Sequence, residues 1–468
     1  MPKVFINGTE FEVVPGTTVL QAALLNGIYV PHFCFHPHLP ISGCCRMCLV
    51  DIEGMPKQQI ACATTVAEGM KVQTESPAVI KSRQIVMEFT LKNHPLDCPI
   101  CDKAGECTLQ DYYMNYDATA SRLDPKDKKV RKGKRAPMGE TLVLDQERCV
   151  LCHRCIRFMS EVANNDCLTD AKRGERTVIT TFPGDLVDNP YSLNLADICP
   201  VGAWTGKDFR FKKRVWFMTK SPSICPFCSR GCNIFIDHEK GTVWRLRPRE
   251  NNAVNQCWMC DEGRLAYKAI NEKRLTKAFE KEGSGRKELS MGAGLSAAAG
   301  LMAGSKGKIL GVLSASATLE EAELFKKLIR ALDGALGYER RKEGKDDAFL
   351  KRADRDANQK GISGLGIDRL AGEGIVKAGL LVVLESLYSE PVNGASGKKS
   401  VVLSPKLSEM AQDSAVCIPI ASFAETGGTF VNFEGKAQKF EAGLELKGEA
   451  GPGERVLREL AKKLGLEL

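Results

Sequence analysis

A chain of 468 residues with nineteen cysteines and a formal net charge of +8 at pH 7 is too long for a small secreted domain held together by disulfides. It opens with "MPKVFINGTEF", where no basic segment precedes an apolar core, so we expect a reducing compartment in which clustered cysteines bind metals. Apolar runs such as "AGLLVVLE" at 378–385 are far shorter than the roughly 18 residues that cross a bilayer, so we expect no direct membrane span.

The first elements that the sequence predicts are a hairpin and a short helix. "KVFINGTEFEV" alternates around Asn7-Gly8, which is the strongest short hairpin signal. "PGTTVLQAALLNG" follows, with Thr17 or Thr18 placed to cap a helix that ends near Gly27. A hairpin, a helix and then a cysteine-rich loop predict a ferredoxin-type β-grasp domain over residues 1–77.

Four cysteines of this first domain form a set with unequal gaps. They are Cys34, Cys45, Cys48 and Cys62. Three thiolates on one loop and a fourth from a later strand fit a [2Fe–2S] centre, although the first gap exceeds that of plant-type ferredoxins. Cys44 could replace Cys45, but that choice would widen the close pair that Cys45 forms with Cys48 from two intervening residues to three.

A second set lies in "HPLDCPICDKAGEC", within a predicted helix-plus-loop module at 78–117. Its members are His94, Cys98, Cys101 and Cys107. Three cysteines and one histidine are ordinary zinc ligands at such spacings, so the motif by itself is compatible with zinc or with iron.

A third set lies in "CVLCHRC" and "DICPVGAW", within a predicted module at 138–217. It comprises Cys149, Cys152, Cys155 and the distant Cys199, which precedes a proline. This is the bacterial ferredoxin arrangement for a [4Fe–4S] cluster, with the last ligand moved away. Zinc is normally held by separated pairs, so iron–sulfur fits this run better, and the neighbouring His94 set is expected to bind the same kind of cofactor.

A fourth set lies in "CPFCSRGC" and "CWMC", within a predicted module at 218–274. The set favoured for a [4Fe–4S] cluster is Cys225, Cys228, Cys232 and Cys260. The alternative is a zinc ribbon that uses Cys257 in place of Cys232. Its central gap exceeds the usual 15–20 residues, and it would leave Cys232 without a role.

From 275 to 468 the composition changes to Ala, Gly, Leu and Lys. "KILGVLSASATLEEAELFKKLIRALDG" at 308–334 predicts a buried strand, a Ser/Thr cap and an amphipathic helix. With further buried strands at "GLLVVLE" and "SVVLSP", this part is expected to be an open α/β sheet. Its Gly-rich pieces fail the nucleotide-binding tests, because "GLGIDR" has Arg369 where a third glycine is needed and "GASGKKS" is too short.

Basic residues are concentrated at 122–135 and 207–216. No aromatic RNA-binding motif, zinc-finger helix or helix-turn-helix pattern accompanies them, so we expect no nucleic-acid partner. A solvated linker or a docking face for an acidic partner is the favoured interpretation.

Taken in order, the motifs resemble those of the large iron–sulfur subunit of bacterial NADH–quinone oxidoreductase, respiratory complex I. The matching stretches are "CRMCLV" with "ACAT", "HPLDCPICDKAGECTLQD", "RCVLCHRCIRF", "DICPVGA" and "CPFCSRGCN" with "CDEGR". They lie within residues 1–274, and "AETGGTFVNFEGKAQ" at 424–438 is similar to that family's C-terminal signature.

The resemblance implies one [2Fe–2S] cluster on the first set and three [4Fe–4S] clusters on the others, the second set being His-ligated. It implies an α+β series of iron–sulfur modules followed by a truncated α/β domain of molybdopterin-oxidoreductase type without pterin. FMN and NAD are not expected on this chain, and no catalytic residue for bond chemistry stands out.

The function that this resemblance implies is an electron relay toward quinone inside an oxidoreductase. Its partners would be the flavin- and NADH-binding subunit and other peripheral-arm subunits, in a complex on the cytoplasmic face of the bacterial plasma membrane. A related NAD-linked formate dehydrogenase or a hydrogenase diaphorase is the nearer alternative, and a zinc-scaffolded interaction protein is the more distant one.

Overall fold

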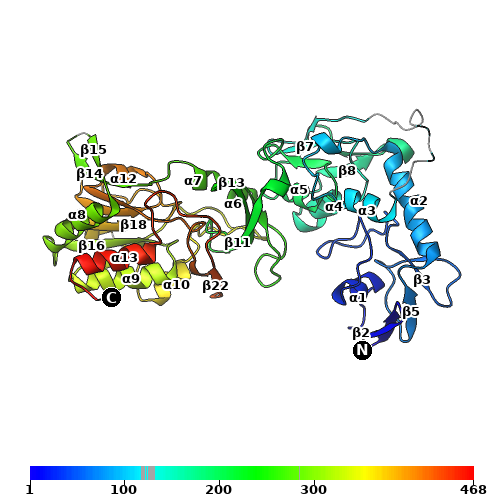
Figure 1. Ribbon diagram of the computed structural model, residues 1–468, viewed down its shortest axis with the longest axis horizontal. Helices are drawn as coiled ribbons and strands as arrows, with labels where there is room; N and C mark the ends of the chain where they lie inside the picture. Colours follow the sequence, from blue (N-terminus) through cyan, green and yellow to red (C-terminus); the bar gives the residue numbers. More distant parts are fainter. Residues whose placement is uncertain (118–121, 123, 125–131, 284, 371, 468) are drawn as a thin grey trace. The chain divides into compact units, whose positions relative to one another are not determined.

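The computed structural model describes the chain apart from residues 118–121, 123, 125–131, 284, 371 and 468. Most of the basic stretch 122–135 therefore lies outside the described residues. The described chain forms two compact units, Met1–Trp216 and Phe217–Leu468, which we call unit 1 and unit 2. Each is described by itself (Figure 1).

Unit 1 begins with a mixed sheet whose strand order is β2-β1-β5-β3-β4. Its elements are β1 (Lys3–Ile6), β2 (Thr9–Glu12), α1 (Val19–Leu25), β3 (Leu49–Ile52), β4 (Gln59–Ile60) and β5 (Met70–Gln73). The predicted hairpin is confirmed, because β1 and β2 pair antiparallel across Asn7 and Gly8, both with positive φ. The predicted helix is confirmed too: Thr18 caps α1 in a capping box with Gln21.

The rest of unit 1 consists of short elements joined by cysteine-bearing loops. Its helices are α2 (Pro77–Asn93), η1 (Cys98–Ile100), α3 (Thr108–Tyr116), α4 (Arg154–Arg157), η3 (Phe158–Val162), η4 (Gly174–Arg176), α5 (Asn194–Ile198) and η5 (Val215–Phe217). Its strands are β6 (Ala136–Pro137), β7 (Leu142–Leu144), β8 (Leu168–Ala171), β9 (Val178–Thr181) and β10 (Trp204–Gly206). Each strand has only two to four residues.

Unit 2 begins with an antiparallel sheet in the order β11-β12-β13, and the two helices α6 and α7 follow it. These elements are β11 (Thr219–Ile224), β12 (Asn233–Glu239), β13 (Thr242–Pro248), α6 (Asp261–Leu265) and α7 (Lys268–Asn271). On β12, Asp237 is completely buried and accepts hydrogen bonds of 2.7 Å from both Arg245 and Arg247 of β13.

The main part of unit 2 is a seven-stranded sheet in the order β15-β14-β20-β19-β18-β16-β17. Its strands are β14 (Ala278–Glu282), β15 (Gly285–Leu289), β16 (Ile309–Ser314), β17 (Ala335–Glu339), β18 (Leu380–Leu384), β19 (Ser400–Ser404) and β20 (Val416–Pro419). Strands β17, β16, β18, β19 and β20 are parallel, and β14 and β15 add an antiparallel edge. The predicted open α/β sheet is thus confirmed.

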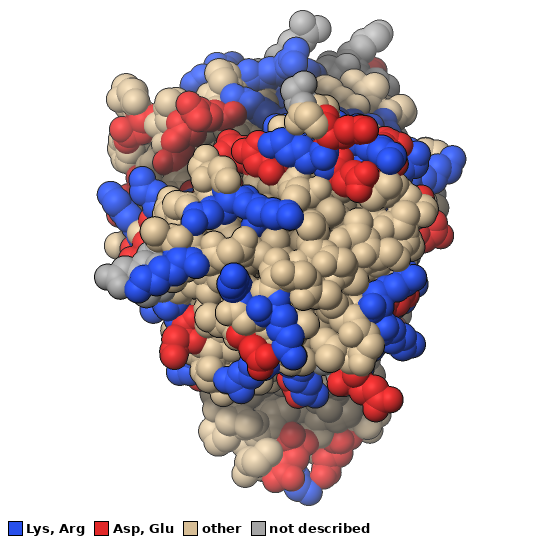
Figure 2. Space-filling model, turned by 90° about the vertical axis from the view of Figure 1, so that its left-hand side faces the viewer, with Lys and Arg blue, Asp and Glu red and all other residues tan. Residues whose placement is uncertain are grey.

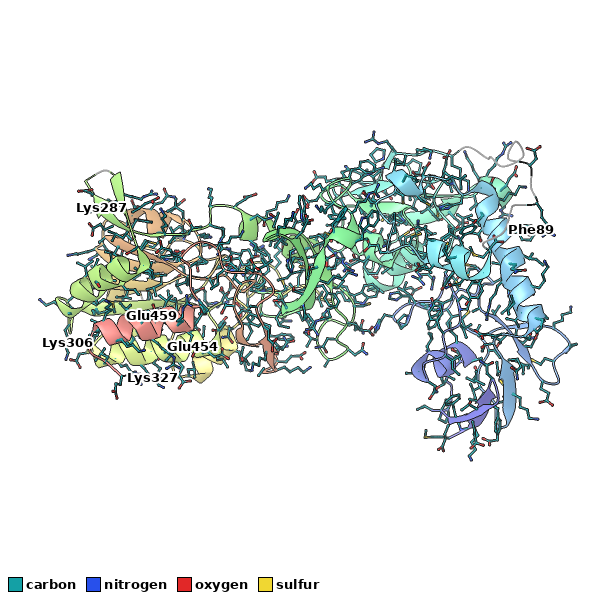
Figure 3. The ribbon with its side chains drawn as sticks, viewed as in Figure 1. Phe89, Lys287, Lys306, Lys327, Glu454 and Glu459 are labelled. Carbon is teal, nitrogen blue, oxygen red and sulfur yellow. The ribbon has the colours of Figure 1, made fainter. Side chains whose placement is uncertain are left out.

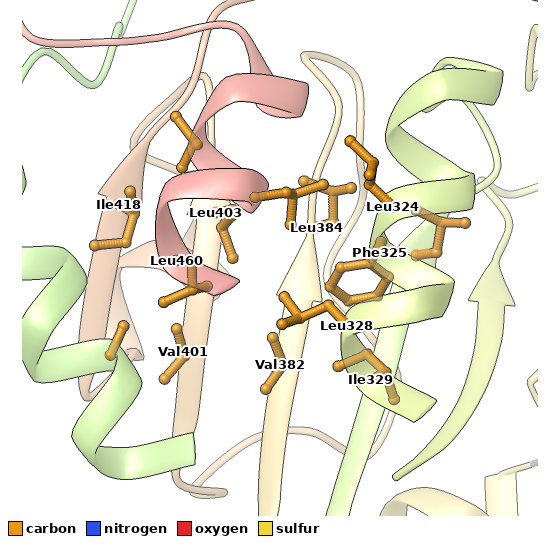
Figure 4. Packing of buried hydrophobic residues seen from close by; sticks show 14 of the residues in the cluster. Leu324, Phe325, Leu328, Ile329, Val382, Leu384, Val401, Leu403, Ile418 and Leu460 are labelled. Atoms are coloured by element: carbon orange, nitrogen blue, oxygen red, sulfur yellow. The ribbon is translucent and has the colours of Figure 1, made fainter. Parts of the chain in front are cut away.

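Helices cover this sheet, with α8 (Met291–Ala303), α9 (Leu319–Ala331) and α13 (Gly453–Lys463) packed together over one face (Figure 1). The other elements are α10 (Gln359–Gly364), α11 (Gly372–Lys377), α12 (Glu409–Asp413), β21 (Gly428–Val431) and β22 (Ala437–Phe440). Thr318 caps α9 with Glu321 in a capping box, as the sequence predicts. Period-two alternation sends Val382 and Leu384 into the core beneath α9 and α13 (Figure 4), and Val383 into the core on the opposite face.

The outer surface of unit 2 mixes both signs of charge around an uncharged area (Figure 2). Lys327 on α9 and Glu454 and Glu459 on α13 lie on this surface (Figure 3) and pair with neighbours one helical turn away. Such exposed pairs contribute little to stability, so we attribute the stability of unit 2 to burial.

Candidate functional site

The four residues of the first set meet between the loop after α1 and the strands β3 and β4. The thiol of Cys34 makes hydrogen-bond contacts with those of Cys44, Cys45 and Cys62, and these contacts hold its pKa well below the usual range. Cys48 contacts Cys62, and the backbone N–H of Cys34 donates to Cys45 Sγ at 3.4 Å.

Cys44 lies at the edge of this set, where its thiol contacts Cys34 and also residues outside the set. It is exposed, and its thiol lies 3.7 Å from the carbonyl oxygens of Leu151 and Cys152 in the loop of the third set. Cys45, in contrast, accepts backbone N–H groups from Phe33 and Cys34. Hydrogen bonds to sulfur are a means by which a protein adjusts an iron–sulfur cluster, so this geometry favours Cys45 as the ligand.

The four residues of the second set line one cavity of about 460 Å³. His94 ends α2, Cys98 lies in η1, Cys101 follows η1, and Cys107 begins α3. The remaining wall includes apolar side chains, among them Leu96, which is 90% exposed at its rim. The helix ends therefore direct one imidazole and three thiols toward a common space.

The His94 imidazole has the properties of a ligand. Burial, with a further contribution from the charge of Arg148, lowers its pKa to about 4, so the ring is neutral near pH 7. Its Nδ1 is buried and has no hydrogen-bond partner among the described residues. A buried polar atom without a partner is costly, and a metal ion bound by neutral imidazole would remove that cost. The residues of this set therefore fit a cluster.

Gly202 brings the second and third sets close together. A Cβ at this position would lie only 2.2 Å from Cys101 Sγ, so no side chain fits there without moving the sulfur. Gly202 lies three residues after Cys199 of the third set, and the N–H of Thr108 donates to the carbonyl of Pro200 at 3.0 Å. Gly202 was not among the predicted site residues, although it lies within the "DICPVGA" motif.

The third set lies where α4 faces α5. Cys149, Cys152, Cys155 and Cys199 surround one space, in which the side chains leave only about 10 Å³. Burial raises the pKa of Cys149 to about 12 and that of Cys152 to about 11. Such thiols bind a metal by releasing their protons to solvent.

The fourth set lies at the end of β11 and the start of β12 and α6. The carbonyl of Cys232 accepts the N–H of Cys225 at 2.8 Å, and the N–H of Gly263 donates to Cys260 Sγ at 3.4 Å. Burial raises the pKa of Cys232, and the nearby charges of Cys228, Cys225 and Cys260 add to the effect. The structure therefore brings Cys232 together with the other three predicted members, which favours this set over the zinc ribbon.

Arginines that were not among the predicted site residues hold these loops together. Arg154 donates to the carbonyls of Ile198 at 3.1 Å and Phe35 at 2.5 Å. Arg157 donates to the carbonyls of Cys34 at 2.5 Å and Cys152 at 3.2 Å. These side chains tie the first-set loop to the third-set loop, and their only sequence signal is their position beside the cysteines of "RCVLCHRCIRF".

Part of the basic stretch 207–216 packs against the second-set loop. Arg214 donates to the carbonyl oxygen of Cys101 at 2.6 Å and to that of Pro99. The N–H of Phe211 donates to the Asp102 carboxylate at 3.0 Å. Arg214 and Phe211 therefore have a structural role within the fold.

Neither a single-ion metal site nor a membrane-spanning helix is found among the described residues. No three His, Cys, Asp or Glu side chains converge closely enough to hold a single metal ion. No helix within the described ranges combines the length and the apolar character that crossing a bilayer requires.

Four family models match the chain, one for each ligand set. Residues 3–77 match a 2Fe-2S iron-sulfur cluster binding domain, and residues 83–122 match the NADH-ubiquinone oxidoreductase-G iron-sulfur binding region. Residues 139–205 match the ferredoxin-like domain of NADH-quinone oxidoreductase subunit 3, and residues 218–272 match the molybdopterin oxidoreductase Fe4S4 domain. The chain thus contains 2Fe–2S and 4Fe–4S binding domains.

Curated relatives bear the name that the motifs suggest. The G subunit of NADH-quinone oxidoreductase from Streptomyces coelicolor is 39% identical over 70% of this chain and 39% of its own length, and that from Rickettsia conorii is 37% identical over 71% and 49%. The 75 kDa subunit of NADH-ubiquinone oxidoreductase from Reclinomonas americana is 36% identical over 76% of this chain and 52% of its own. The matched regions thus cover from about two fifths to about half of these relatives.

Solved structures also include chains with a similar sequence. A chain of an NAD+-reducing [NiFe]-hydrogenase in the H2-reduced state is 31% identical, covers 46% of this chain and 91% of its own, and superposes with a TM-score of 0.41.

Proposed function

This chain is a homologue of the G subunits of NADH-quinone oxidoreductases, and we propose that it serves such an enzyme as an electron relay. It carries electrons from the flavin of the NADH dehydrogenase subunit through iron–sulfur clusters toward quinone. One observation carries the proposal: each of four ligand sets is gathered within a segment that matches an iron–sulfur family model.

The proposed ligands are the sixteen residues predicted from the motifs. A [2Fe–2S] cluster is held by Cys34, Cys45, Cys48 and Cys62. Three [4Fe–4S] clusters are held by His94, Cys98, Cys101 and Cys107, by Cys149, Cys152, Cys155 and Cys199, and by Cys225, Cys228, Cys232 and Cys260. When bound, the clusters supply one-electron redox chemistry, and the chain supplies the ligands, the hydrogen bonds and the apolar surroundings that set their potentials.

We further propose that the third cluster stands between the first and the second on the relay. Cys44, Arg154 and Arg157 connect the first-set loop directly to the third-set loop. Gly202 and Lys103, whose Nζ donates to the carbonyl of Ala196 at 3.0 Å, connect the third set to the second. The spatial order that these contacts support therefore differs from the order of the sets along the chain.

The α/β part of unit 2 has a structural or docking role in this proposal. It is an open sheet that follows the segment matching the molybdopterin oxidoreductase Fe4S4 domain, and we propose that it holds no pterin. Arg341 donates to the carbonyls of Pro226 and Phe227 beside the fourth set, so the α/β part also helps to cover that set.

The partners in this proposal are the flavin- and NADH-binding subunit and other peripheral-arm subunits of a complex on the cytoplasmic face of the bacterial plasma membrane. The test is to add NADH anaerobically to the iron-loaded chain, alone and with the flavoprotein partner, and to follow cluster reduction by EPR. The proposal predicts reduction only with the partner. Rapid reduction of the isolated chain by NADH, or no reduction in the presence of the partner, would contradict it.

A further inference from the structure

Arg148 is a buried cation in the wall of the second-set cavity. It is 4% exposed and lies one residue before Cys149 of the third set, yet its side chain lines the cavity that contains His94 and Cys101. Its Cδ lies 3.7 Å from the point that a Cβ on Gly202 would occupy, and that point is 2.2 Å from Cys101 Sγ. The Arg148 stem and the Cys101 sulfur therefore flank the same glycine.

Two carboxylates fix the guanidinium in this place. Its Nε and Nη2 donate to Asp97 Oδ2 at 3.3 and 3.1 Å, and Nε lies 3.3 Å from Asp145 Oδ2. Asp97 also pairs with Lys134 at 2.6 Å, so it is shared between two cations. A guanidinium stays charged at every pH at which the protein is folded. Arg148 thus contributes a permanent positive charge to the wall of the second-set cavity, beside the Asp97 carboxylate that also lines it.

The position of this charge matters because the site is partly shielded from water. Charges interact more strongly where the surroundings are less polar, and buried charges are less screened by salt. A reduced cluster carries one more negative charge than an oxidised cluster, so a fixed cation beside it favours the reduced form.

We propose that Arg148 raises the reduction potential of the His94-ligated cluster and thereby makes it a better electron acceptor from the third set. Neutral imidazole and buried guanidinium then act in the same direction on one cluster. This inference rests on the proposed function, because it requires the second set to hold iron–sulfur.

The charges around the cavity offer substitutions with opposite expected signs. Arg148→Gln removes the cation and should lower the potential, whereas Asp97→Asn removes an anion from the same network and should raise it. Arg148→Lys keeps the charge and should restore most of the wild-type potential. A role that was only structural would not reverse sign between the arginine and aspartate variants.

The experiment is a potentiometric titration of the anaerobically purified, iron-loaded full chain, followed by EPR, with the fourth-set cluster of unit 2 as an internal reference. We expect Arg148→Gln to lower the reduction potential of the second-set cluster by ~59 mV relative to this reference. For a one-electron centre, that shift makes reduction of the cluster about tenfold less favourable. Lys212→Gln is the matched control. It removes one exposed cation, paired with Asp208 at 3.6 Å, and should leave the potential unchanged.

The possible outcomes separate this inference from the proposed function. If wild-type protein shows no second-set cluster by EPR and iron analysis, the proposed function fails at this site and the inference fails with it. If the cluster is present and Arg148→Gln leaves its potential unchanged, only the inference is overturned. If Arg148→Gln does not retain the cluster, Asp97→Asn decides: a higher potential supports the inference, and an unchanged or lower one overturns it.

Discussion

Unit 1 and unit 2 differ in what holds them together. In unit 2, the strands β16, β18, β19 and β20 are buried along their whole length, between two hydrophobic cores. In unit 1 beyond residue 94, the strands have two to four residues, and arginine side chains bonded to backbone carbonyls connect the cysteine loops.

The difference indicates where each region obtains its stability. Burial of apolar surface stabilises a packed sheet without any cofactor. Short loops that converge on thiols have little apolar surface to bury, and metal binding then supplies folding free energy. We therefore expect the cluster-binding loops of unit 1 to depend on iron and the α/β sheet of unit 2 to be independent of it.

The largest expected effect is that of withholding iron from the full chain. Backbone amides at 94–107 and 149–199 should lose most of their protection from hydrogen exchange, because the clusters that join these loops are missing. Amides of β16, β18 and β19 should keep theirs, since their protection comes from the buried sheet. Mass spectrometry of exchange in iron-loaded and iron-free chain measures both, and equal protection of the unit 1 loops in the two samples would contradict the comparison.

Gly202→Ala should remove one cluster and leave the others. The new methyl would lie 2.2 Å from Cys101 Sγ, so the sulfur has to move away from the second set. We expect the loss of about four irons per chain, measured by iron analysis, together with loss of the second-set EPR signal. Gly300→Ala in α8 is the control, since a Cβ there meets nothing within 4 Å. Full iron content in Gly202→Ala would show that the two sets are not packed this closely.

Leu460→Ala should weaken unit 2 without affecting iron. Leu460 of α13 is completely buried in the core beneath the helices (Figure 4), and such a truncation costs about 2–5 kcal/mol. Urea unfolding followed by hydrogen exchange in β18 and β19 would measure the loss. Val376→Ala, at a side chain that is 69% exposed, should have little effect. Iron loss from the unit 1 sites in Leu460→Ala would mean that the two units are not independent.

His94→Cys should produce the smallest change, a shift in one potential. A thiolate in place of neutral imidazole keeps a cluster ligand but adds a negative charge, so the potential should fall. A fall on the order of 100 mV changes the one-electron equilibrium by more than tenfold. Potentiometric titration with EPR detection measures it, with the third-set cluster as reference. An unchanged potential and spectrum would mean that His94 is not a ligand.

Local features of the fold and the cysteine sets could be predicted because their signals are local. Asn7-Gly8 needs positive φ at both residues, and Thr18 and Thr318 cap the helices that follow them directly. The cysteine spacings are typical of loops around clusters, whatever the rest of the chain does. Signals of this kind lie within a few residues of the feature that they predict.

The contacts between the sets could not be predicted, since they join residues far apart in the sequence. Arg154 bonds to Phe35 across 119 positions, and Gly202 lies against Cys101 although neither motif refers to the other. A buried arginine such as Arg148 also has no pattern of its own, because its partners Asp97 and Asp145 become neighbours only when the loops have packed. The spatial order of the sets and the charge on the wall of the second-set cavity could therefore be inferred only from the structure.

Metal and sulfide analysis of the anaerobically purified full chain tests the central claim most directly. One [2Fe–2S] and three [4Fe–4S] clusters predict about fourteen irons per chain, an equal amount of acid-labile sulfide, broad visible absorption and essentially no zinc. About ten irons in a fully loaded sample would remove one [4Fe–4S] site. A colourless protein with stoichiometric zinc and no sulfide would contradict the relay and establish the zinc-scaffolded alternative.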